Sequence, residues 1–368
     1  MKNIAIVFLG DFFYDARCIN MALSLKKQYT VFVFCPYQEI HSHKSFDKIN
    51  FVQIQLSHRG IFRYWEHFYQ TLRALNQYSF DTIVAGDLYS LASAVYAKQK
   101  KHILYDCREI YSALAAHQYR PMHRCLLSLY EKYFLKYVNK VLVTAETDLN
   151  YLKKKYSRYT NLDWQIIYNY PANYSPQIKQ NLHKYYRIPS DNKIILYQGV
   201  ISRGRGIGQL IKLIEKTNIY SAVIVGGGTY KQYYADYALS LNISHRVHFV
   251  DKVPYLKLFE YTAACDVGWS VIGGNTLSYK FALPNKLFEY LLSNLPVVAS
   301  NLPNLKKIIK NYSVGELVDS YNLDQQIKAV NKLFEEKNSP VNYKNIARKY
   351  FTWDVQHNKF LQIINQLK

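Results

Sequence analysis

The chain has 368 residues, of which 49% are hydrophobic and 20% charged, and it carries a formal net charge of +21. This length suits two domains better than one, and the composition excludes a disordered chain. The charge favours a polyanionic partner such as nucleic acid, anionic lipid headgroups or phosphorylated small molecules. Five widely spaced cysteines without a C-x-x-C pair argue against a disulfide framework and a zinc site, and suit the cytoplasm.

The aromatic content is high, with 36 Tyr, 18 Phe and 4 Trp. We expect some of these rings on surfaces or in clefts, although an AT-rich genome explains the excess equally well. The apolar run 4–9 is too short for a signal peptide and predicts a first buried strand. No apolar run approaches the ~18 residues that a membrane-spanning helix needs, so we expect no such helix.

In the N-terminal half, short apolar runs alternate with longer amphipathic segments. The predicted strands are 4–9, 31–35, 51–56, 82–85, 103–105 and 141–144. Helical spacing occurs in 16–27, 64–76, 88–98 and 121–137. Nearly unbroken apolar strands that alternate with helices predict an α/β fold with a parallel, doubly wound sheet.

The polar stretch 169–192 interrupts this pattern, which then restarts. The second set of predicted strands is 193–198, 221–225, 246–250, 267–270 and 296–299, and the predicted helices are 208–216, 231–241, 256–264, 285–293, 304–310 and 353–367. We therefore predict two Rossmann-like domains, 1–172 and 193–345, with a linker 173–192 and a C-terminal segment 346–368. Such domains bind ligands at the carboxyl ends of their strands, so two facing domains would form a cleft.

Two glycine-rich turns follow predicted strands of the second domain. The first runs from Gly199 to Gly208 and includes Arg203, Arg205 and Gly206. Glycines allow a ligand to approach the backbone, and a following helix N-terminus favours an anion, although an exposed basic turn is the alternative. In the second turn, Gly226 and Gly227 begin a run of three glycines, which either admits a ligand or serves a turn with positive φ.

A third segment, 282–300, places polar side chains at the start of a helix. Pro284 favours a helix entry, and Asn285, Lys286 and Glu289 share one face because they are three and four residues apart. A lysine and backbone N–H groups at a helix N-terminus suit a diphosphate, and a carboxylate one turn later can accept hydrogen bonds from two ribose hydroxyls. A Lys–Glu surface pair on a core helix is the alternative.

This third segment resembles the donor-site signature of family-4 glycosyltransferases with the GT-B fold, in the subgroup that reads P-N-K-x-x-E-Y before a Pro-Val-Val-Ala-Ser strand. Further stretches resemble family landmarks in the right order, namely 15–17, 105–109, 141–146, 166–171, 196–206, 223–228, 246–268 and 350–353. The last of these resembles the start of a C-terminal helix that, in this fold, crosses back to the N-terminal domain.

The resemblance implies a role for each matching position. Arg205 and Lys286 would be the catalytic cations that hold the donor diphosphate, with Arg203 as a helper and Glu289 on the ribose. The remaining donor-binding positions would be Gly199, Gly206, Gly226, Gly227 and Asn285, and the acceptor-side positions Gly10, Asp15, Arg17 and Arg108. No metal site is predicted, and no cofactor besides the nucleotide-diphosphate sugar, which is the donor substrate.

The chain departs from the family pattern at three positions. Phe281 stands where many relatives have a glutamate, although many P-N-K relatives also lack it. Arg108 occupies the histidine position of a common D-x-H-E sequence, and Arg205 replaces the lysine of K-G. These departures leave open which group contacts the transferred sugar and whether this copy is active.

Members of this family retain anomeric configuration and generally need no metal, because basic residues stabilise the leaving phosphates. The resemblance therefore implies metal-independent hexosyl transfer to a saccharide or lipid-linked saccharide, in cell-surface polysaccharide biosynthesis. One alternative is a catalytically silent, glycosyltransferase-like binding or partner subunit. A nucleic-acid-binding protein is a weaker alternative, because the sequence has no helix-turn-helix, RNP or zinc signature.

Segments 59–69 and 120–140 mix basic residues with aromatic ones, as helices at a membrane interface do. Ordinary helices that cover a sheet are the alternative. Peripheral attachment to the inner face of the cytoplasmic membrane would bring a cytoplasmic enzyme to a lipid-linked acceptor. It would also account for part of the positive charge.

Overall fold

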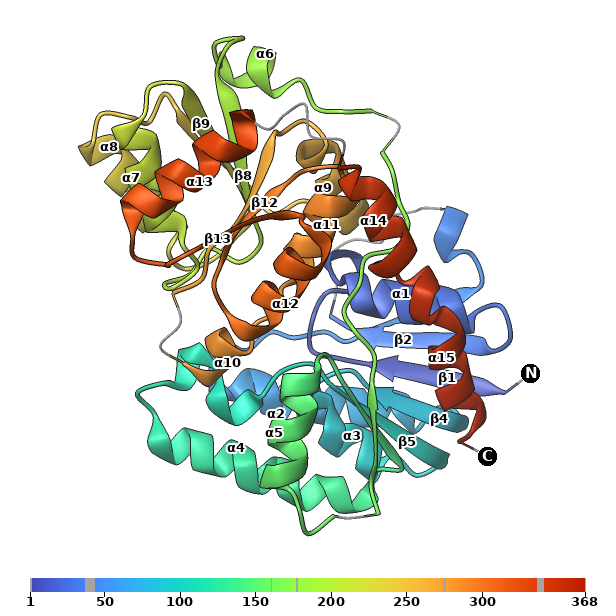
Figure 1. The fold of residues 1–368 in the computed structure, drawn as a ribbon. Helices are drawn as coiled ribbons and strands as arrows, with labels where there is room; N and C mark the ends of the chain where they lie inside the picture. Colours follow the sequence, from blue (N-terminus) through green and yellow to red (C-terminus); the bar gives the residue numbers. More distant parts are fainter. Residues whose placement is uncertain are drawn as a thin grey trace. The chain divides into compact units, whose positions relative to one another are not determined.

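The chain folds into two compact units, each built on one parallel β-sheet (Figure 1). The structure is a computed structural model that describes residues 2–36, 44–159, 161–176, 178–273, 276–335 and 341–367. The first unit comprises Met1–Ala172 and Trp353–Lys368, and the second comprises Asn173–Thr352.

The first unit contains a seven-stranded sheet with strand order β3-β2-β1-β4-β5-β6-β7. All six strand pairings are parallel. The strands are β1 (Asn3–Val7), β2 (Thr30–Cys35), β3 (Ile49–Gln53), β4 (Phe80–Ala85), β5 (Lys100–Cys107), β6 (Lys140–Val143) and β7 (Asp163–Ile166). The order reverses at β1, and ligands of doubly wound sheets bind at such a point, beyond the carboxyl ends of the strands.

The helices of the first unit follow its strands in the chain. They are α1 (Ala16–Leu25), α2 (Ile61–Leu75), α3 (Leu91–Tyr96), α4 (Pro121–Phe134), α5 (Glu146–Lys155) and α15 (Asp354–Asn365). Short 3₁₀ turns occur at Phe12–Tyr14, Lys44–Phe46, Leu88–Ser90, Tyr111–Ala113, Ala115–His117 and Leu135–Tyr137. Local chemistry determines two of the helix starts: the Asp15 carboxylate accepts the Cys18 N–H at 2.7 Å, and Pro121 occupies the first turn of α4.

The second unit contains a six-stranded parallel sheet with strand order β10-β9-β8-β11-β12-β13. Its strands are β8 (Lys193–Gln198), β9 (Tyr220–Val225), β10 (Val247–Val250), β11 (Val267–Ser270), β12 (Val297–Ser300) and β13 (Gly315–Val318). Its helices are α6 (Leu182–Tyr186), α7 (Ile207–Lys216), α8 (Lys231–Ser240), α9 (Tyr255–Thr262), α10 (Leu277–Lys280), α11 (Asn285–Leu292), α12 (Pro303–Tyr312), α13 (Leu323–Glu335) and α14 (Tyr343–Tyr350).

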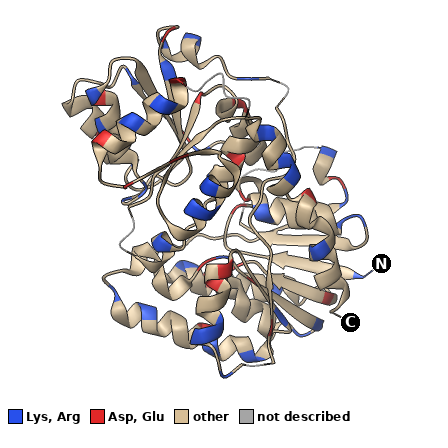
Figure 2. Ribbon diagram, viewed as in Figure 1, with Lys and Arg blue, Asp and Glu red and all other residues tan. Residues whose placement is uncertain are grey.

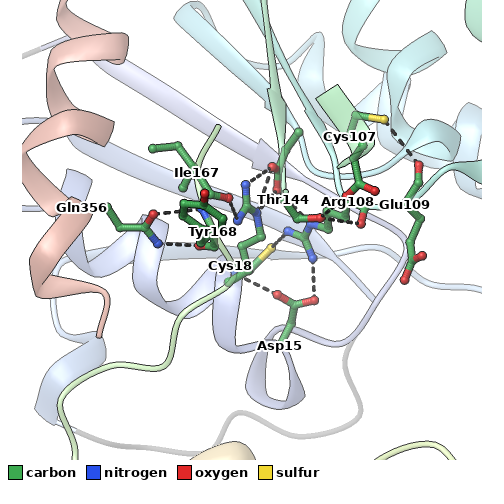
Figure 3. Close-up of polar contacts among 12 residues, drawn as sticks. Asp15, Cys18, Cys107, Arg108, Glu109, Thr144, Ile167, Tyr168 and Gln356 are labelled. Carbon is green, nitrogen blue, oxygen red and sulfur yellow. Dashed lines mark hydrogen bonds and ion pairs between the residues drawn. The ribbon is translucent and has the colours of Figure 1, made fainter. Parts of the chain in front are cut away.

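The C-terminal helix α15 belongs to the first unit rather than to the second. The Trp353 backbone N–H donates to the Pro171 carbonyl at 2.7 Å, and its indole N–H donates to the Ser24 hydroxyl at 2.7 Å. Figure 3 shows the Gln356 side chain bonded to both backbone groups of Tyr168. The predicted fold class, two parallel α/β sheets with a last helix that returns to the first, is confirmed.

Two strands were missing from the sequence prediction, and both lie at the edge of a sheet. These strands, β7 and β13, each have only one neighbouring strand, and their sequences (DWQI and GELV) lack an apolar run. The other two edge strands, β3 and β10, were predicted because they keep apolar residues (INFVQ and VHFV). The segment predicted as a linker lies within the second unit and contains α6. Within the described parts of the chain, no helix is both long and apolar enough to cross a membrane.

Candidate active site

The two glycine-rich turns of the second unit lie against each other at the carboxyl ends of β8 and β9. The Gly199 N–H donates to the Val225 carbonyl at 3.0 Å, and the Ile201 N–H donates to the Gly227 carbonyl at 2.9 Å. A Cβ atom at Gly226 would stand 1.9 Å from the Gly199 carbonyl oxygen, so no other residue fits there. A Cβ at Gly199 would meet nothing within 4 Å, which leaves the first turn open to a ligand on that side.

Gly206 joins the first turn to helix α7. Its φ is +71°, and a Cβ there would lie 2.2 Å from the Val271 carbonyl oxygen. The indole N–H of the buried Trp269 donates to the Gly206 carbonyl at 2.9 Å. Packing against β11 and the segment after it therefore holds this turn in one conformation, which positions the neighbouring Arg205.

Tyr279 on α10 supports both arginines of the first turn. Its hydroxyl donates to the Arg203 carbonyl at 2.8 Å, and the Arg205 guanidinium carbon lies 5.2 Å from the centre of its ring. The Arg203 side chain is exposed, whereas Arg205 is half-buried. The Arg205 Nε is buried and has no hydrogen-bond partner within the described part of the chain. An aromatic ring under a guanidinium fixes its plane and leaves its N–H groups available.

Helix α11 begins at Asn285, after Pro284 in an extended conformation. Pro284 has no side chain that could cap this helix start, and the Leu287 N–H donates to the Pro284 carbonyl at 3.1 Å, which leaves the N–H groups of Asn285 and Lys286 to face a ligand. Lys286, the second residue of α11, is 6% exposed, and its Nζ lies 3.6 Å from the centre of the Tyr197 ring. Among the residues that the structure describes, nothing forms a hydrogen bond with this ammonium group.

The environment of Lys286 disfavours its positive charge. Burial lowers the pKa of Lys286 well below its ordinary value, and the charge of Arg205 lowers it further, while Glu289 opposes both effects. Arg205 and Lys286 therefore approach each other closely enough to repel. A buried ammonium with no hydrogen bond is costly unless an anion compensates it. The geometry thus brings together the two predicted cations at an uncapped helix start.

Glu289 lies one turn after Lys286 and is held by a chain of buried side chains. The side-chain amide nitrogen of Gln198 donates to the Glu289 carboxylate at 2.5 Å. The Thr262 hydroxyl donates to the side-chain oxygen of Gln198 at 2.8 Å. Burial raises the pKa of Glu289 to about 7, against the opposing effects of hydrogen bonds from Gln198 and Tyr255 and the charge of Lys286. This carboxyl group is therefore close to half-protonated near neutral pH.

The sequence analysis did not identify the residues that position this group. The Tyr290 hydroxyl accepts the Gln198 N–H and donates to the Leu196 carbonyl, both at 3.1 Å, and so joins α11 to β8. A Cβ atom at Gly268 would lie 2.1 Å from the Tyr290 ring. Tyr290 and Gly268 lie within motifs quoted above, but their contact joins two elements that sequence spacing does not relate.

The predicted acceptor-side residues lie in the first unit, and three of them form one ion-pair network. Arg17 is 1% exposed and donates to both Asp106 oxygens at 2.6–2.9 Å and to the Ile167 carbonyl at 2.7 Å. Burial alone would raise the pKa of Asp106, but Arg17 and Arg108 outweigh it and lower that pKa. Arg17 thus anchors β5 to α1, and its contribution to acceptor binding stays a prediction.

Arg108 pairs with the same Asp106 carboxylate, and Figure 3 shows its guanidinium between Asp15 and Cys18. Its guanidinium donates to Asp106 at 2.8 Å, to Asp15 at 2.6 Å and to the Cys18 sulfur at 2.9 Å. Its side chain is 14% exposed and that of Asp15 is 26% exposed, so both keep one edge open to solvent. A ligand would therefore meet a guanidinium whose charge two carboxylates already compensate.

Gly10, the remaining acceptor-side position, is exposed after β1. The preceding residue, Leu9, donates its N–H to the Asp87 carboxylate at 2.7 Å, and Asp87 also accepts the Ser90 N–H at 2.8 Å. This aspartate ties the turn after β1 to the turn after β4, where a doubly wound sheet binds its ligand. The sequence analysis did not single out Asp87.

Comparison with known proteins first defines the fold. A sucrose-phosphate synthase from Thermosynechococcus elongatus superposes with a TM-score of 0.79 at 17% identity, over 100% of this chain and 99% of that one. Anabaena HepE, in complex with UDP and glucose, superposes with a TM-score of 0.76 at 14% identity over the whole of both chains. At these identities the likeness concerns the fold, which is the GT-B glycosyltransferase fold.

Sequence comparison gives two partial matches, one of which lies within the second unit. Residues 178–350 match the family model of the glycosyl transferases group 1. An uncharacterized glycosyltransferase of Methanocaldococcus jannaschii is 26% identical over 204 residues, which cover 52% of this chain and 50% of that protein. The chain thus spans about half the length of this curated relative. Together the two kinds of comparison show that the chain has the GT-B fold and that its second unit is similar to the glycosyl transferases group 1.

The raised pKa of Glu289 predicts a pH-dependent stability. Because this pKa is higher in the folded protein (about 7) than the ordinary value of 4.5, its stabilising contribution is complete below pH 4.5 and is lost as the pH rises through 7. Glu289→Gln imitates the protonated carboxyl and has no such loss. The difference in free energy of unfolding between the Glu289→Gln variant and the wild type should therefore increase, in favour of the variant, by up to about 3 kcal/mol between pH 4.5 and pH 8.

Urea unfolding of both proteins without nucleotide, at several pH values in this range, measures this difference. Titrations of groups that do not interact with residue 289 cancel because both proteins share them. A difference that stays constant from pH 4.5 to pH 8 would contradict the assigned environment of Glu289.

Proposed function

We propose that this chain is a retaining glycosyltransferase that moves a hexosyl group from a nucleotide-diphosphate sugar to a saccharide or lipid-linked saccharide. One observation carries the proposal above all others. Lys286 is buried at the uncapped start of α11, beside Arg205, and among the described residues its ammonium has no hydrogen-bond partner. A dianionic diphosphate would supply the missing charge and the missing acceptors.

The same two cations account for the chemistry. When the bond between the anomeric carbon and the diphosphate breaks, negative charge grows on the leaving phosphate while the sugar becomes oxocarbenium-like. Cations and helix N–H groups that are already oriented toward that phosphate stabilise the charge without reorganisation. Arg205 is oriented by Tyr279, and Lys286 is held by its burial in α11. We assign no nucleophilic carboxylate, because the leaving phosphate can accept the acceptor's proton.

Glu289 is proposed to accept hydrogen bonds from the ribose hydroxyls. Gln198 occupies one carboxylate oxygen, so ribose would compete for the remaining lone pairs of a group whose pKa is about 7. The ionised form of Glu289 should therefore accept these hydrogen bonds better than its protonated form does. HepE, whose solved complex contains UDP and glucose, has the same fold, and uridine-diphosphate sugars are the first donors to test.

The acceptor and the place of action complete the proposal. We propose that the acceptor is part of cell-surface polysaccharide biosynthesis and that the enzyme works in the cytoplasm, at the inner face of the cytoplasmic membrane. Support comes from the net charge of +21, and Figure 2 shows Lys and Arg residues distributed over both units. Gly10, Asp15, Arg17 and Arg108 remain the proposed acceptor-side positions, with Arg17 acting through Asp106.

Removal of either cation should reduce turnover. Arg205→Ala or Lys286→Ala should lower kcat with a nucleotide-sugar donor by about two to three orders of magnitude, the usual loss for one transition-state contact. Lys212→Ala, an exposed position on α7, is the matched control and should retain full activity. Initial rates of donor hydrolysis or sugar transfer, with folding checked by circular dichroism, measure the effect. Near-wild-type rates in both alanine variants would overturn the assignment.

Chelation tests whether these cations replace a metal ion. Because Arg205 and Lys286 are proposed to stabilise the leaving phosphate, transfer should proceed unchanged in EDTA and should gain little from added magnesium or manganese. The assay compares initial rates with EDTA, with EDTA plus excess metal, and with neither. Loss of activity in EDTA together with recovery on metal addition would show that the leaving group needs a metal.

A further inference from the structure

Two helices of the first unit expose large apolar side chains that its core does not use. On α2, residues Ile61, Phe62, Trp65 and Tyr69 are 63–67% exposed. On α4, the stripe Met122, Leu126 and Leu129 is 56–80% exposed. The spacing of these positions, three and four residues apart, places each set on one side of its helix. We name these seven side chains the α2–α4 face.

Helix α3 connects the two parts of the α2–α4 face. The Tyr96 ring at the end of α3 lies 6.2 Å from that of Phe68 on α2 and 5.9 Å from that of Phe134 on α4. Tyr96 itself is half exposed, and Tyr133 on α4 and Tyr137 in the 3₁₀ turn after it continue the aromatic surface. Exposed apolar surface of this extent is unusual on a soluble protein and marks a binding site.

The exposed charged side chains of α2, of α4 and of the residues next to them are basic. The surrounding exposed cations are Arg59, Arg63, Arg73, Arg120, Arg124, Lys132 and Lys136. Figure 2 shows this basic character along α4. Each helix contains one acid. Glu66 accepts the N–H groups of Ser57 and His58 at 2.9–3.0 Å, and the buried Glu131 accepts the Tyr105 hydroxyl at 2.8 Å.

We propose that the α2–α4 face lies in the interface of an anionic phospholipid bilayer. Apolar side chains would enter the boundary between headgroups and acyl chains, while the surrounding cations contact phosphates. A second copy of the chain fits less well, because two such faces would bring like charges together. A single-stranded nucleic acid also fits less well, because Ile61, Met122 and the two leucines offer no ring for a base to stack on.

The position of the α2–α4 face at the bilayer surface indicates the class of acceptor. In a parallel α/β unit the helix N-termini lie at the carboxyl edge of the sheet, so the starts of α2 and α4 are close to the turns that contain Gly10 and Asp87. An acceptor bound there would be presented from the bilayer surface, as the saccharide head of a membrane-anchored lipid. The acceptor class depends on the proposed transferase activity, whereas the bilayer contact does not.

Trp65 offers a direct probe of insertion. The chain has four tryptophans, and the other three, Trp164, Trp269 and Trp353, are at most 8% exposed. Titration of the full chain with phosphatidylglycerol vesicles should shift the fluorescence emission of Trp65 to shorter wavelengths. Vesicles with brominated acyl chains should quench that emission. Raised salt should weaken this binding without abolishing the quenching, because apolar insertion is not screened. Neutral phosphatidylcholine vesicles should bind poorly.

The variant Phe62→Ser/Leu126→Ser should weaken binding to anionic vesicles by about tenfold or more, since each side chain loses its favourable burial. The matched control, Tyr185→Ser/Leu239→Ser, changes two exposed side chains of the second unit and should bind as the wild type does. Both variants should hydrolyse donor at the wild-type rate. If donor hydrolysis is absent in every protein while vesicle insertion persists, the transferase proposal fails and the bilayer contact stands.

Three results would overturn the bilayer contact. One is an unchanged Trp65 spectrum at saturating anionic lipid. Another is binding that depends on charge alone, with the Phe62→Ser/Leu126→Ser variant unaffected. The third is sedimentation of the wild-type chain as a dimer that this variant converts to a monomer, which would assign the face to a second copy.

Discussion

The candidate site depends on one unfavourable arrangement, a buried lysine beside a half-buried arginine. Lys286 is 6% exposed, and among the described side chains its ammonium finds a tyrosine ring but no hydrogen-bond acceptor. The neighbouring carboxyl group does not resolve this imbalance, because Glu289 is bonded to Gln198 and has a pKa of about 7. The folded chain thus places two basic side chains together, and its own residues only partly compensate the charge that they can carry. A site of this kind is stabilised by the anion it binds.

Contacts within the second unit hold the two basic side chains in this arrangement. Trp269 and the close contact with Val271 hold the turn at Gly206, Tyr279 supports Arg205, and Tyr290 joins α11 to β8. Each of these contacts involves the carboxyl edge of the second sheet or the helix that follows it. The first unit shows the opposite electrostatic arrangement, because Asp15 and Asp106 compensate Arg108. We propose that the first unit binds its ligands at the exposed Gly10 turn and on the α2–α4 face instead.

Much of the fold could be predicted from the sequence, because interior parallel strands are apolar on both faces. The runs at 31–35 and 193–198 are buried on both sides and stand out for that reason. Edge strands such as β7 and β13 lack this signal, and the short helix α6 lies in a stretch too polar to stand out. Motif spacing placed Arg205, Lys286 and Glu289 in one unit. It could not predict that Glu289 is buried against Gln198 and Tyr255, which is a tertiary contact.

Proton uptake on nucleotide binding tests the central claim most directly. If a diphosphate compensates Lys286, its lowered pKa must rise on binding, so the complex must take up protons. Calorimetric titrations with UDP at a series of pH values from 8.5 upward, where Glu289 is already ionised, in buffers of different ionisation enthalpy, measure that uptake. We predict net uptake by the wild type and none by Lys286→Met. Binding of UDP without uptake, or equal uptake by both proteins, would contradict the account.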